Sequence, residues 1–273
     1  MQKTYECVNL AIDGDVATVQ LNRPEKRNCL SPTLHRNMVD ALNEVARAQC
    51  KVMVVTGTGD SFSAGMDLEQ CFLEPFDDPE KFNAVNAPCF EWFTHLKSFP
   101  AVTVAKVNGW AFGGGFEIAG ICDIVIAAEE SVWGLSEINF GIFPGGGATW
   151  SYAHNMLRKQ ALFYALTGAT FTGKEAVALG MANIAVPLKD LDAEVDKWVR
   201  NLARKGRTVL RKTKEVYEKS LRLTFAESME WEMAKMWELS RETNDDWIRT
   251  ALASFKKREF KPGLQDYTLT RDV

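Results

Sequence analysis

Residues 109–120 read GWAFGGGFEIAG, with three consecutive glycines, Gly113–Gly115, between an aromatic run and Glu117. The segment directly before it, AVTVAKVN at 101–108, is rich in β-branched residues and predicts a buried strand. Glycine lets the backbone approach a bound group closely, and the N–H groups that begin a helix carry positive partial charge. The order of strand, glycine turn and helix therefore predicts a site where backbone N–H groups face a ligand.

Two kinds of ligand fit such a turn. Dinucleotide-binding folds have the same order of elements, but their glycines are spaced as G-x-G-x-x-G, and Glu117 would place negative charge where a pyrophosphate lies. The alternative is an oxyanion site, where N–H groups stabilise the enolate oxygen of a bound thioester. The contiguous glycines favour the oxyanion site. A second bend, GDSFSAGMDLEQ at 59–70, offers another donor from the N–H of Met66.

Composition describes an ordinary globular protein. The chain has 273 residues, of which 46% are hydrophobic and 25% charged, and its net charge is −4. These values predict a large core and no general attraction for nucleic acid or anionic membranes. Six cysteines without a CxxC pair and three histidines without zinc-type spacing predict no metal site. The start of the chain has no signal-peptide pattern, and no apolar run is long enough to span a bilayer, so we expect a cytoplasmic protein with reduced cysteines.

Alternating β-branched runs and amphipathic patterns predict an α/β fold. Two strands joined at DGD are expected within 5–21, and a helix is expected after the Ser31–Pro32 pair. Past about residue 186 the strand patterns stop. Helices are predicted there over 188–204, 206–220, 224–243 and 244–257. The Trp- and Met-rich stretch 229–247 is apolar on more than one face, which indicates either core packing or a surface against a second subunit.

Several separate motifs resemble the crotonase, or enoyl-CoA hydratase, superfamily in order and spacing from about residue 5 to the end of the chain. They are SFSAGMDL, NGWAFGGGFE, CDIVIAAEESVWGLSEINFGIFPGGGATW and LTGATFTGKEAVALGMANIAVP. Within the superfamily, NRPEKRN and the terminal KPGLQDY are most similar to hydroxycinnamoyl-CoA (feruloyl-CoA) hydratase-lyases. The resemblance implies a spiral of ββα turns over 1–186 that holds the active site. It also implies a helical region over 187–273 that covers the site and packs trimers, often paired as hexamers.

The resemblance assigns roles to particular residues. It implies that the N–H groups of Met66 and Gly114 form the oxyanion hole. Glu137 would exchange a proton at Cα of the thioester, and Glu117 would orient and activate the water that adds at Cβ. It further implies that the residues binding CoA are Lys26, Arg27, Ala64 and Leu68, and that the acyl group is lined by Cys71, Ser136, Phe140 and Phe116. Coenzyme A is then part of the substrate, and no separate cofactor is expected.

This sequence departs from the hydratase-lyases at four positions. Those enzymes carry a serine at the position of Glu117 and two tyrosines that hold the para-hydroxyl of the substrate. Here one tyrosine position is Cys71, and the other falls near Glu232 or Met233. A tryptophan after the first acid motif is replaced by Phe140. Hydration needs none of the missing groups, whereas retro-aldol cleavage in the hydratase-lyases uses the phenol anchors.

Three functions stay open on the sequence alone. The first is hydration of a trans-2-enoyl-CoA with an aryl group such as hydroxycinnamoyl, followed or not by retro-aldol release of acetyl-CoA and an aromatic aldehyde. The second is hydration or isomerisation of aliphatic enoyl-CoA without lyase activity, because a single glutamate suffices to move a proton between carbons. The third is binding of acyl-CoA without turnover, which the presence of two acids disfavours.

Overall fold

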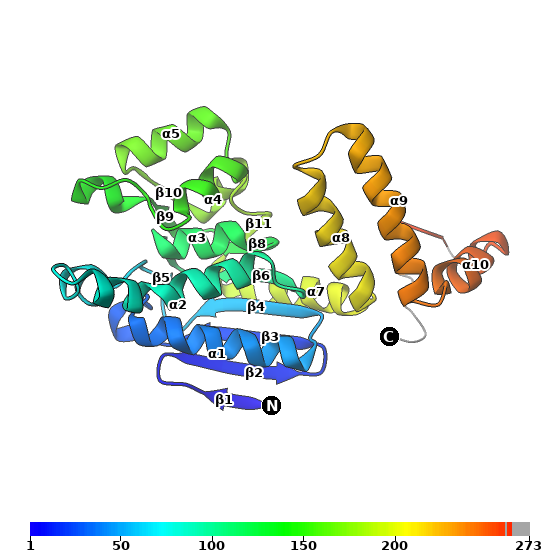
Figure 1. The fold of residues 1–273 in the computed structure, drawn as a ribbon, viewed down its shortest axis with the longest axis horizontal. Coiled ribbons are helices and arrows are strands. Elements are labelled where there is room, and N and C mark those ends of the chain that lie inside the picture. The colour runs from blue at the N-terminus through cyan, green and yellow to red at the C-terminus, as the bar shows by residue number, and fades with distance from the viewer. Residues whose placement is uncertain (260, 264–273) are drawn as a thin grey trace.

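The computed structural model describes residues 1–259 and 261–263, and it shows a mixed α/β fold built on two sheets (Figure 1). The larger sheet has the strand order β1-β2-β3-β4-β6-β8-β11 and is parallel from β3 onward. Its strands are β1 Gln2–Thr4, β2 Val8–Asp13, β3 Val16–Leu21, β4 Val52–Gly57, β6 Val102–Val107, β8 Ile124–Ala128 and β11 Ile184–Val186. The smaller sheet has the order β10-β9-β7-β5. Its strands are β5 Ser61–Ser63, β7 Trp110–Phe112, β9 Val132–Gly134 and β10 Thr170–Thr172.

Helices surround both sheets. In the first 186 residues they are η1 Pro24–Lys26, α1 Pro32–Ala48, η2 Glu69–Leu73, α2 Pro79–Lys97, α3 Gly114–Ile121, η3 Ser136–Phe140, α4 Ala148–Asn155, α5 Arg158–Thr167 and α6 Gly173–Ala178. After the last strand they are η4 Leu188–Asp190, α7 Leu191–Ala203, α8 Arg207–Ser220, α9 Phe225–Glu242, η5 Trp247–Leu252 and α10 Ala253–Lys256. No helix in the described part of the chain is both long and apolar enough to cross a membrane.

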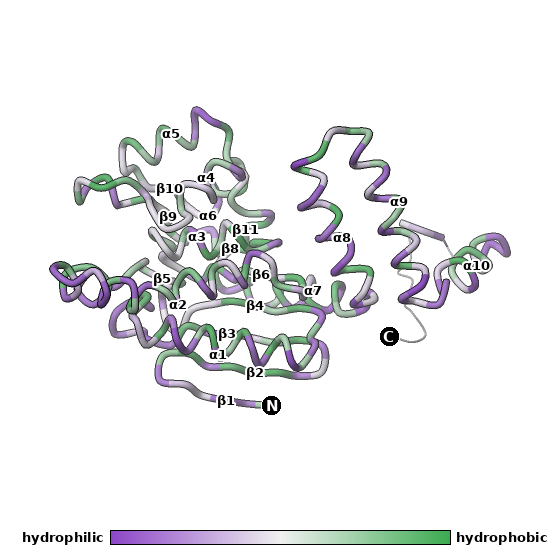
Figure 2. Tube along the Cα trace, in the orientation of Figure 1, coloured by the Kyte–Doolittle hydropathy of each residue, from purple (hydrophilic) through white to green (hydrophobic). Residues whose placement is uncertain are grey.

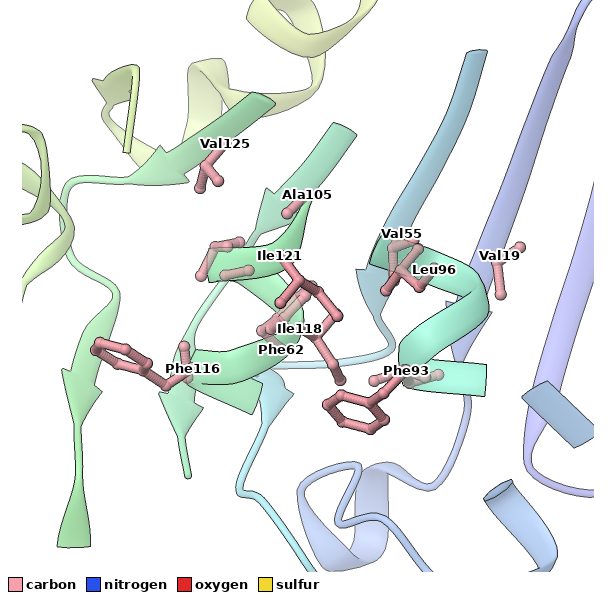
Figure 3. Packing of buried hydrophobic residues seen from close by; sticks show 14 of the residues in the cluster. Val19, Val55, Phe62, Phe93, Leu96, Ala105, Phe116, Ile118, Ile121 and Val125 are labelled. Carbon is pink, nitrogen blue, oxygen red and sulfur yellow. The ribbon is translucent and has the colours of Figure 1, made fainter. Parts of the chain in front are cut away.

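Both faces of the large sheet are covered, which explains why its central strands β4 and β6 are mostly apolar and almost entirely buried (Figure 2). Along β4, Met53 and Val55 belong to the main core, whereas Val52 and Val54 belong to a second cluster with α7. Figure 3 shows the first face, where strand residues meet α2 and α3. The residues labelled there are Val19, Val55, Phe62, Phe93, Leu96, Ala105, Phe116, Ile118, Ile121 and Val125.

The expected local signals are confirmed at the start of the chain. Strands β2 and β3 pair antiparallel up to Asp13 and Val16, joined by the DGD turn. The side chain of Ser31 accepts a hydrogen bond from the Leu34 N–H, 3.2 Å away, and Pro32 is the first residue of α1. A serine cap satisfies one of the helix N–H groups that has no partner within the helix, so α1 begins where the sequence predicts.

His35 is a buried basic group whose protonation opposes folding. It is fully buried, and its Nδ1 accepts a hydrogen bond from Trp92 Nε1 at 2.9 Å. Burial, aided by the charge of Arg36, lowers the pKa of His35 from 6.5 to about 4. The unfolded chain therefore takes up this proton near pH 6.5 while the folded chain does not, and stability falls as the pH drops through this window.

We expect this one group to cost about 3 kcal/mol of unfolding free energy between pH 6.5 and 4. Urea titrations across that range measure the slope in the unmodified protein and in His35→Gln, whose amide oxygen can still accept from Trp92. The variant should show the shallower dependence, and His154→Gln at an exposed histidine should not. Equal slopes for all three proteins would contradict the assignment.

The C-terminal helices form a hairpin, α8–α9, that stands beside the main body of the fold (Figure 1). Ion pairs join its two helices. Lys212 Nζ on α8 contacts Glu238 and lies 3.0 Å from Glu242 Oε1, both on α9. Lys235 Nζ on α9 lies 2.6 Å from Glu215 Oε1 on α8. A cavity of about 510 Å³ is lined by residues 97–100 and by side chains of both helices of the hairpin. Large apolar side chains of α9 are exposed, namely Phe225, Met229, Met233, Met236 and Trp237. The terminal KPGLQDY motif spans residues 261–267, and its last four residues, 264–267, lie outside the described part of the chain.

Candidate active site

Two glycine-containing bends, distant in sequence, meet at the start of α3. Gly65 has φ of 91° and Gly113 has φ of 47°, a region that favours glycine. A β-carbon built on Gly65 would lie 2.9 Å from the Phe112 carbonyl oxygen and 3.3 Å from the Gly114 nitrogen. The two bends are therefore in direct backbone contact, and a side chain at Gly65 would push them apart.

The backbone N–H groups of Met66 and Gly114 have no hydrogen-bond acceptor among the described residues. Gly114 is the first residue of α3, so its N–H has no partner within the helix. Met66 pairs with Leu30 as an isolated parallel bridge whose hydrogen bonds use the flanking Gly65 carbonyl and Asp67 N–H. Across the described residues neither N–H donates to another protein group. Two unpaired donors on touching bends are the arrangement that an oxyanion hole needs.

Glu117 lies on the first turn of α3 and is only 6% exposed. Its carboxyl group packs against the glycine run that precedes α4. A β-carbon built on Gly147 would lie 2.0 Å from Glu117 Oε1, so a side chain at that position cannot coexist with this placement of the carboxyl. The second glycine run therefore makes room for the first acid.

Glu137 comes from the short helix η3 and approaches the same bend. A β-carbon built on Gly113 would lie 2.9 Å from Glu137 Oε1. Its other oxygen, Oε2, is buried and has no hydrogen-bond partner among the described residues. Leaving a buried carboxyl oxygen without a hydrogen-bond partner costs free energy. A ligand that donates a hydrogen bond to this oxygen would remove that cost.

Burial raises the pKa of both carboxyls. For Glu117 burial acts together with the negative charge of Glu137, and its pKa rises from 4.5 to about 8. For Glu137 burial raises the pKa, and a hydrogen bond with its own backbone partly opposes this. Two carboxyls close together in an apolar setting do not ionise together easily. Glu117 is therefore mostly protonated at neutral pH.

The residues expected to bind CoA lie on one loop system beside the oxyanion bend. The Ala64 N–H donates to the Arg27 carbonyl at 2.9 Å, which fixes the two loops together. Lys26 and Arg27 are exposed, and the Arg27 guanidinium lies 4.0 Å from the centre of the Trp110 ring. Leu68 is 45% exposed. The loops therefore present two cations and an apolar side chain to solvent, with Trp110 as a neighbour that the sequence did not suggest.

The expected acyl-lining residues divide into two groups. Ser136 is half-buried on the same turn as Glu137, and Phe140 is 65% exposed at the end of that turn. Cys71 and Phe116, also expected to line the acyl group, are fully buried in this structure. Phe116 packs edge-on against Trp133 and Phe171 in the core, and this packing leaves it no surface for a ligand.

Sequence reasoning missed two features of the site. The first is the role of the glycine run 145–147, which was visible in the motif GIFPGGGATW but has meaning only once Gly147 meets Glu117. The second is Leu30, a plain hydrophobic residue that contacts both oxyanion bends. No local pattern distinguishes such a leucine from any other core residue.

Comparison with known proteins identifies a family whose model matches most of the chain. The family model for enoyl-CoA hydratase/isomerase matches residues 11–262. The chain belongs to this family. It is 36% identical to the hydroxycinnamoyl-CoA hydratase-lyase of Pseudomonas fluorescens over 267 residues, which cover 96% of this chain and 97% of that protein.

Solved structures of enoyl-CoA hydratases share the fold. Subunit I of a Geobacillus kaustophilus enoyl-CoA hydratase is 30% identical, with a TM-score of 0.85 over 96% of this chain and 98% of that one. A Thermobifida fusca protein assigned as an enoyl-CoA hydratase is 29% identical and was solved in complex with CoA. Its TM-score is 0.78, and the match covers 92% of this chain and 95% of that one.

Proposed function

We propose that the protein adds water across the double bond of a trans-2-enoyl-CoA thioester. The observation that carries the proposal is that the buried Glu117 and the half-buried Glu137 are close enough for their charges to interact, and that Glu137 lies against the bend that carries the unpaired N–H groups of Met66 and Gly114. The thioester oxygen would accept from both N–H groups, so that they stabilise the enolate that forms during the reaction. Loss of one such donor typically costs about 3 kcal/mol of transition-state stabilisation.

A carboxyl pair that shares one proton would suit this chemistry. For hydration, the ionised carboxyl Glu117 takes a proton from water as the oxygen adds at Cβ, and the protonated Glu137 delivers its proton to Cα. In the reverse direction Glu137 removes the Cα proton, and Glu117 protonates the departing hydroxyl. The raised pKa of Glu117 favours the form that begins dehydration, and moving the proton to Glu137 gives the form that begins hydration.

For the acyl group we propose an aryl chain of the hydroxycinnamoyl type. The relative from Pseudomonas fluorescens supports this substrate class. The ring of Phe140, on the same short helix as Glu137, is exposed and would give an aryl group an apolar contact. Carbon–carbon cleavage after hydration is a separate question. The two tyrosines that bind the phenol in the hydratase-lyases are replaced at the corresponding positions of this chain, so the proposal commits to hydration and leaves cleavage to the test below.

Incubation with feruloyl-CoA tests the proposal directly. We expect loss of the conjugated thioester absorbance, and crotonyl-CoA in parallel reveals any preference for an aliphatic chain. Detection of an aromatic aldehyde and acetyl-CoA would show cleavage, whereas accumulation of the β-hydroxy thioester would show hydration alone. No change in absorbance with any aryl or alkyl enoyl-CoA would reject the proposal.

We further propose that copies of this chain associate through α9, as a trimer or a pair of trimers. The inward side of α9 is bound to α8 by ion pairs, whereas its exposed side carries the five large apolar side chains named above. A second apolar surface near the site, formed by Phe140, Ile142, Phe143, Phe163 and Leu166, is also exposed. Exposed apolar surface on two separate parts of one chain fits a ring in which each copy covers the next.

Replacing Met233 by aspartate is expected to break this association, because a charge would be buried without a partner. Sedimentation velocity at micromolar concentration should show a fall from the oligomer to the monomer mass. Glu230→Gln, at an exposed polar position of the same helix, should leave the mass unchanged. A monomeric unmodified protein would refute the oligomer, and an unchanged mass for Met233→Asp would exclude α9 as the contact.

A further inference from the structure

Leu30 joins the two bends that carry the oxyanion donors. It lies between η1 and α1 and is fully buried. Its N–H donates to the Gly65 carbonyl at 2.8 Å, and its carbonyl accepts from the Asp67 N–H at 3.0 Å. These two bonds hold the residues on either side of Met66. The backbone of Leu30 therefore fixes the direction in which the Met66 N–H points.

The side chain of Leu30 reaches the other donor. A β-carbon built on Gly114 would lie 2.7 Å from Leu30 Cδ1 and 3.8 Å from its Cγ. The same β-carbon would lie 3.7 Å from the Cα of Gly65, so Leu30 occupies the space where the two bends come together. One residue thus contacts the first bend through its backbone and the second through its methyl group.

Cys71 adds a further hydrogen bond to Leu30. Its thiol donates to the Leu30 carbonyl at 3.4 Å, and the cysteine is fully buried. Asp67, which also donates to Leu30, is held by Arg23 at 2.6 Å. The Leu30 carbonyl therefore has two donors, and Leu30 is tied to neighbours that are themselves fixed.

We propose that Leu30 is a positioning residue that sets the separation and direction of the Met66 and Gly114 N–H groups. The inference rests on the proposed function, because it assumes that a thioester oxygen binds between these donors. Hydrogen bonds weaken quickly as donor and acceptor move from their best distance and angle. Displacement of catalytic groups by about 1 Å can cost on the order of 100-fold in rate. A shortened side chain at position 30 lets the Gly114 bend shift while every group that touches substrate is kept.

The test compares four proteins: the unmodified chain, Leu30→Ala, Leu30→Met and Leu42→Ala. Methionine nearly conserves the volume of leucine and can keep the contact with Gly114. Leu42 is a fully buried leucine of the same core cluster on α1, and it serves as the matched control for lost packing. If Leu30→Ala does not fold, Leu30→Val removes the same methyl contact with a smaller cavity.

The readout is the carbonyl stretch of bound 3-phenylpropanoyl-CoA labelled with carbon-13 at the thioester. This saturated analogue has no double bond to hydrate, and oxyanion donors shift its stretch to lower frequency. We expect the shift to fall by at least half in Leu30→Ala, with kcat for an enoyl-CoA lowered about 10-fold or more and KM changed less than about 3-fold. Leu30→Met should keep most of the shift, and Leu42→Ala should keep all of it in the folded protein.

The outcomes separate the inference from the proposed function. A bound analogue with no carbonyl shift in the unmodified protein would reject the oxyanion site, and with it the proposed hydration mechanism. A normal shift there that persists unchanged in Leu30→Ala would overturn the role of Leu30 alone. An equal loss of shift in Leu42→Ala would show a general packing effect and would also overturn it.

Discussion

Replacing Glu137 by glutamine is expected to lower kcat for hydration of an enoyl-CoA about 1,000-fold, within the range of general acid–base catalysis. Glutamine keeps the size of the side chain but cannot give a proton to Cα or remove one. The oxyanion donors stay in place, so binding of the thioester should change little, and KM should stay within a few-fold. Initial rates with feruloyl-CoA or crotonyl-CoA, whichever is turned over, measure both constants.

Glu117→Gln separates the two enzyme hypotheses. Hydration needs a second group to take the proton from water, so this variant should lose activity to a similar degree. Isomerisation needs only one acid, so an isomerase would keep most of its activity. Asp40→Asn, at an exposed carboxyl on α1, is the control for loss of a negative charge. Full hydratase activity in both glutamine variants would contradict the mechanism.

Glu117 should also make the stability of the folded protein depend strongly on pH. Glu117 has a pKa of about 8 in the folded protein against 4.5 for the ordinary side chain, because of burial and the charge of Glu137. The folded state therefore binds this proton more tightly than the unfolded state. The resulting stability is fully present below pH 4.5 and is lost as the pH rises through 8. The full loss is about 5 kcal/mol.

We expect Glu117→Gln to be more stable than the unmodified protein at pH 9 by several kcal/mol and nearly equal to it at pH 4.5. Guanidinium titrations at both pH values measure the difference. His35 acts in the opposite direction and over a lower window, so only the difference between variant and unmodified protein isolates Glu117. A variant that is less stable at pH 9 would show that the carboxyl of Glu117 is not a buried, strained group.

The local elements were predictable because their causes are local. The Ser31–Pro32 pair begins α1, the DGD turn joins β2 to β3, and β-branched runs become β4, β6 and β8. The end of strands near residue 186 also follows from pattern, since β11 ends at Val186. The smaller sheet was not predicted. Its strands have three residues each, too few to show a period of two.

The sequence by itself determined the residue types of the site: glycines in two bends, two glutamates, and the basic loop at Lys26 and Arg27. Only the tertiary structure decided which of them meet. Gly65 touches Gly114 across nearly fifty residues, Gly147 leaves the space that Glu117 fills, and Leu30 spans both bends. The tertiary structure also buries Phe116 in the core and raises the pKa of Glu117. Contact, burial and the charge of a neighbour depend on how distant segments pack, and no local pattern in the chain encodes them.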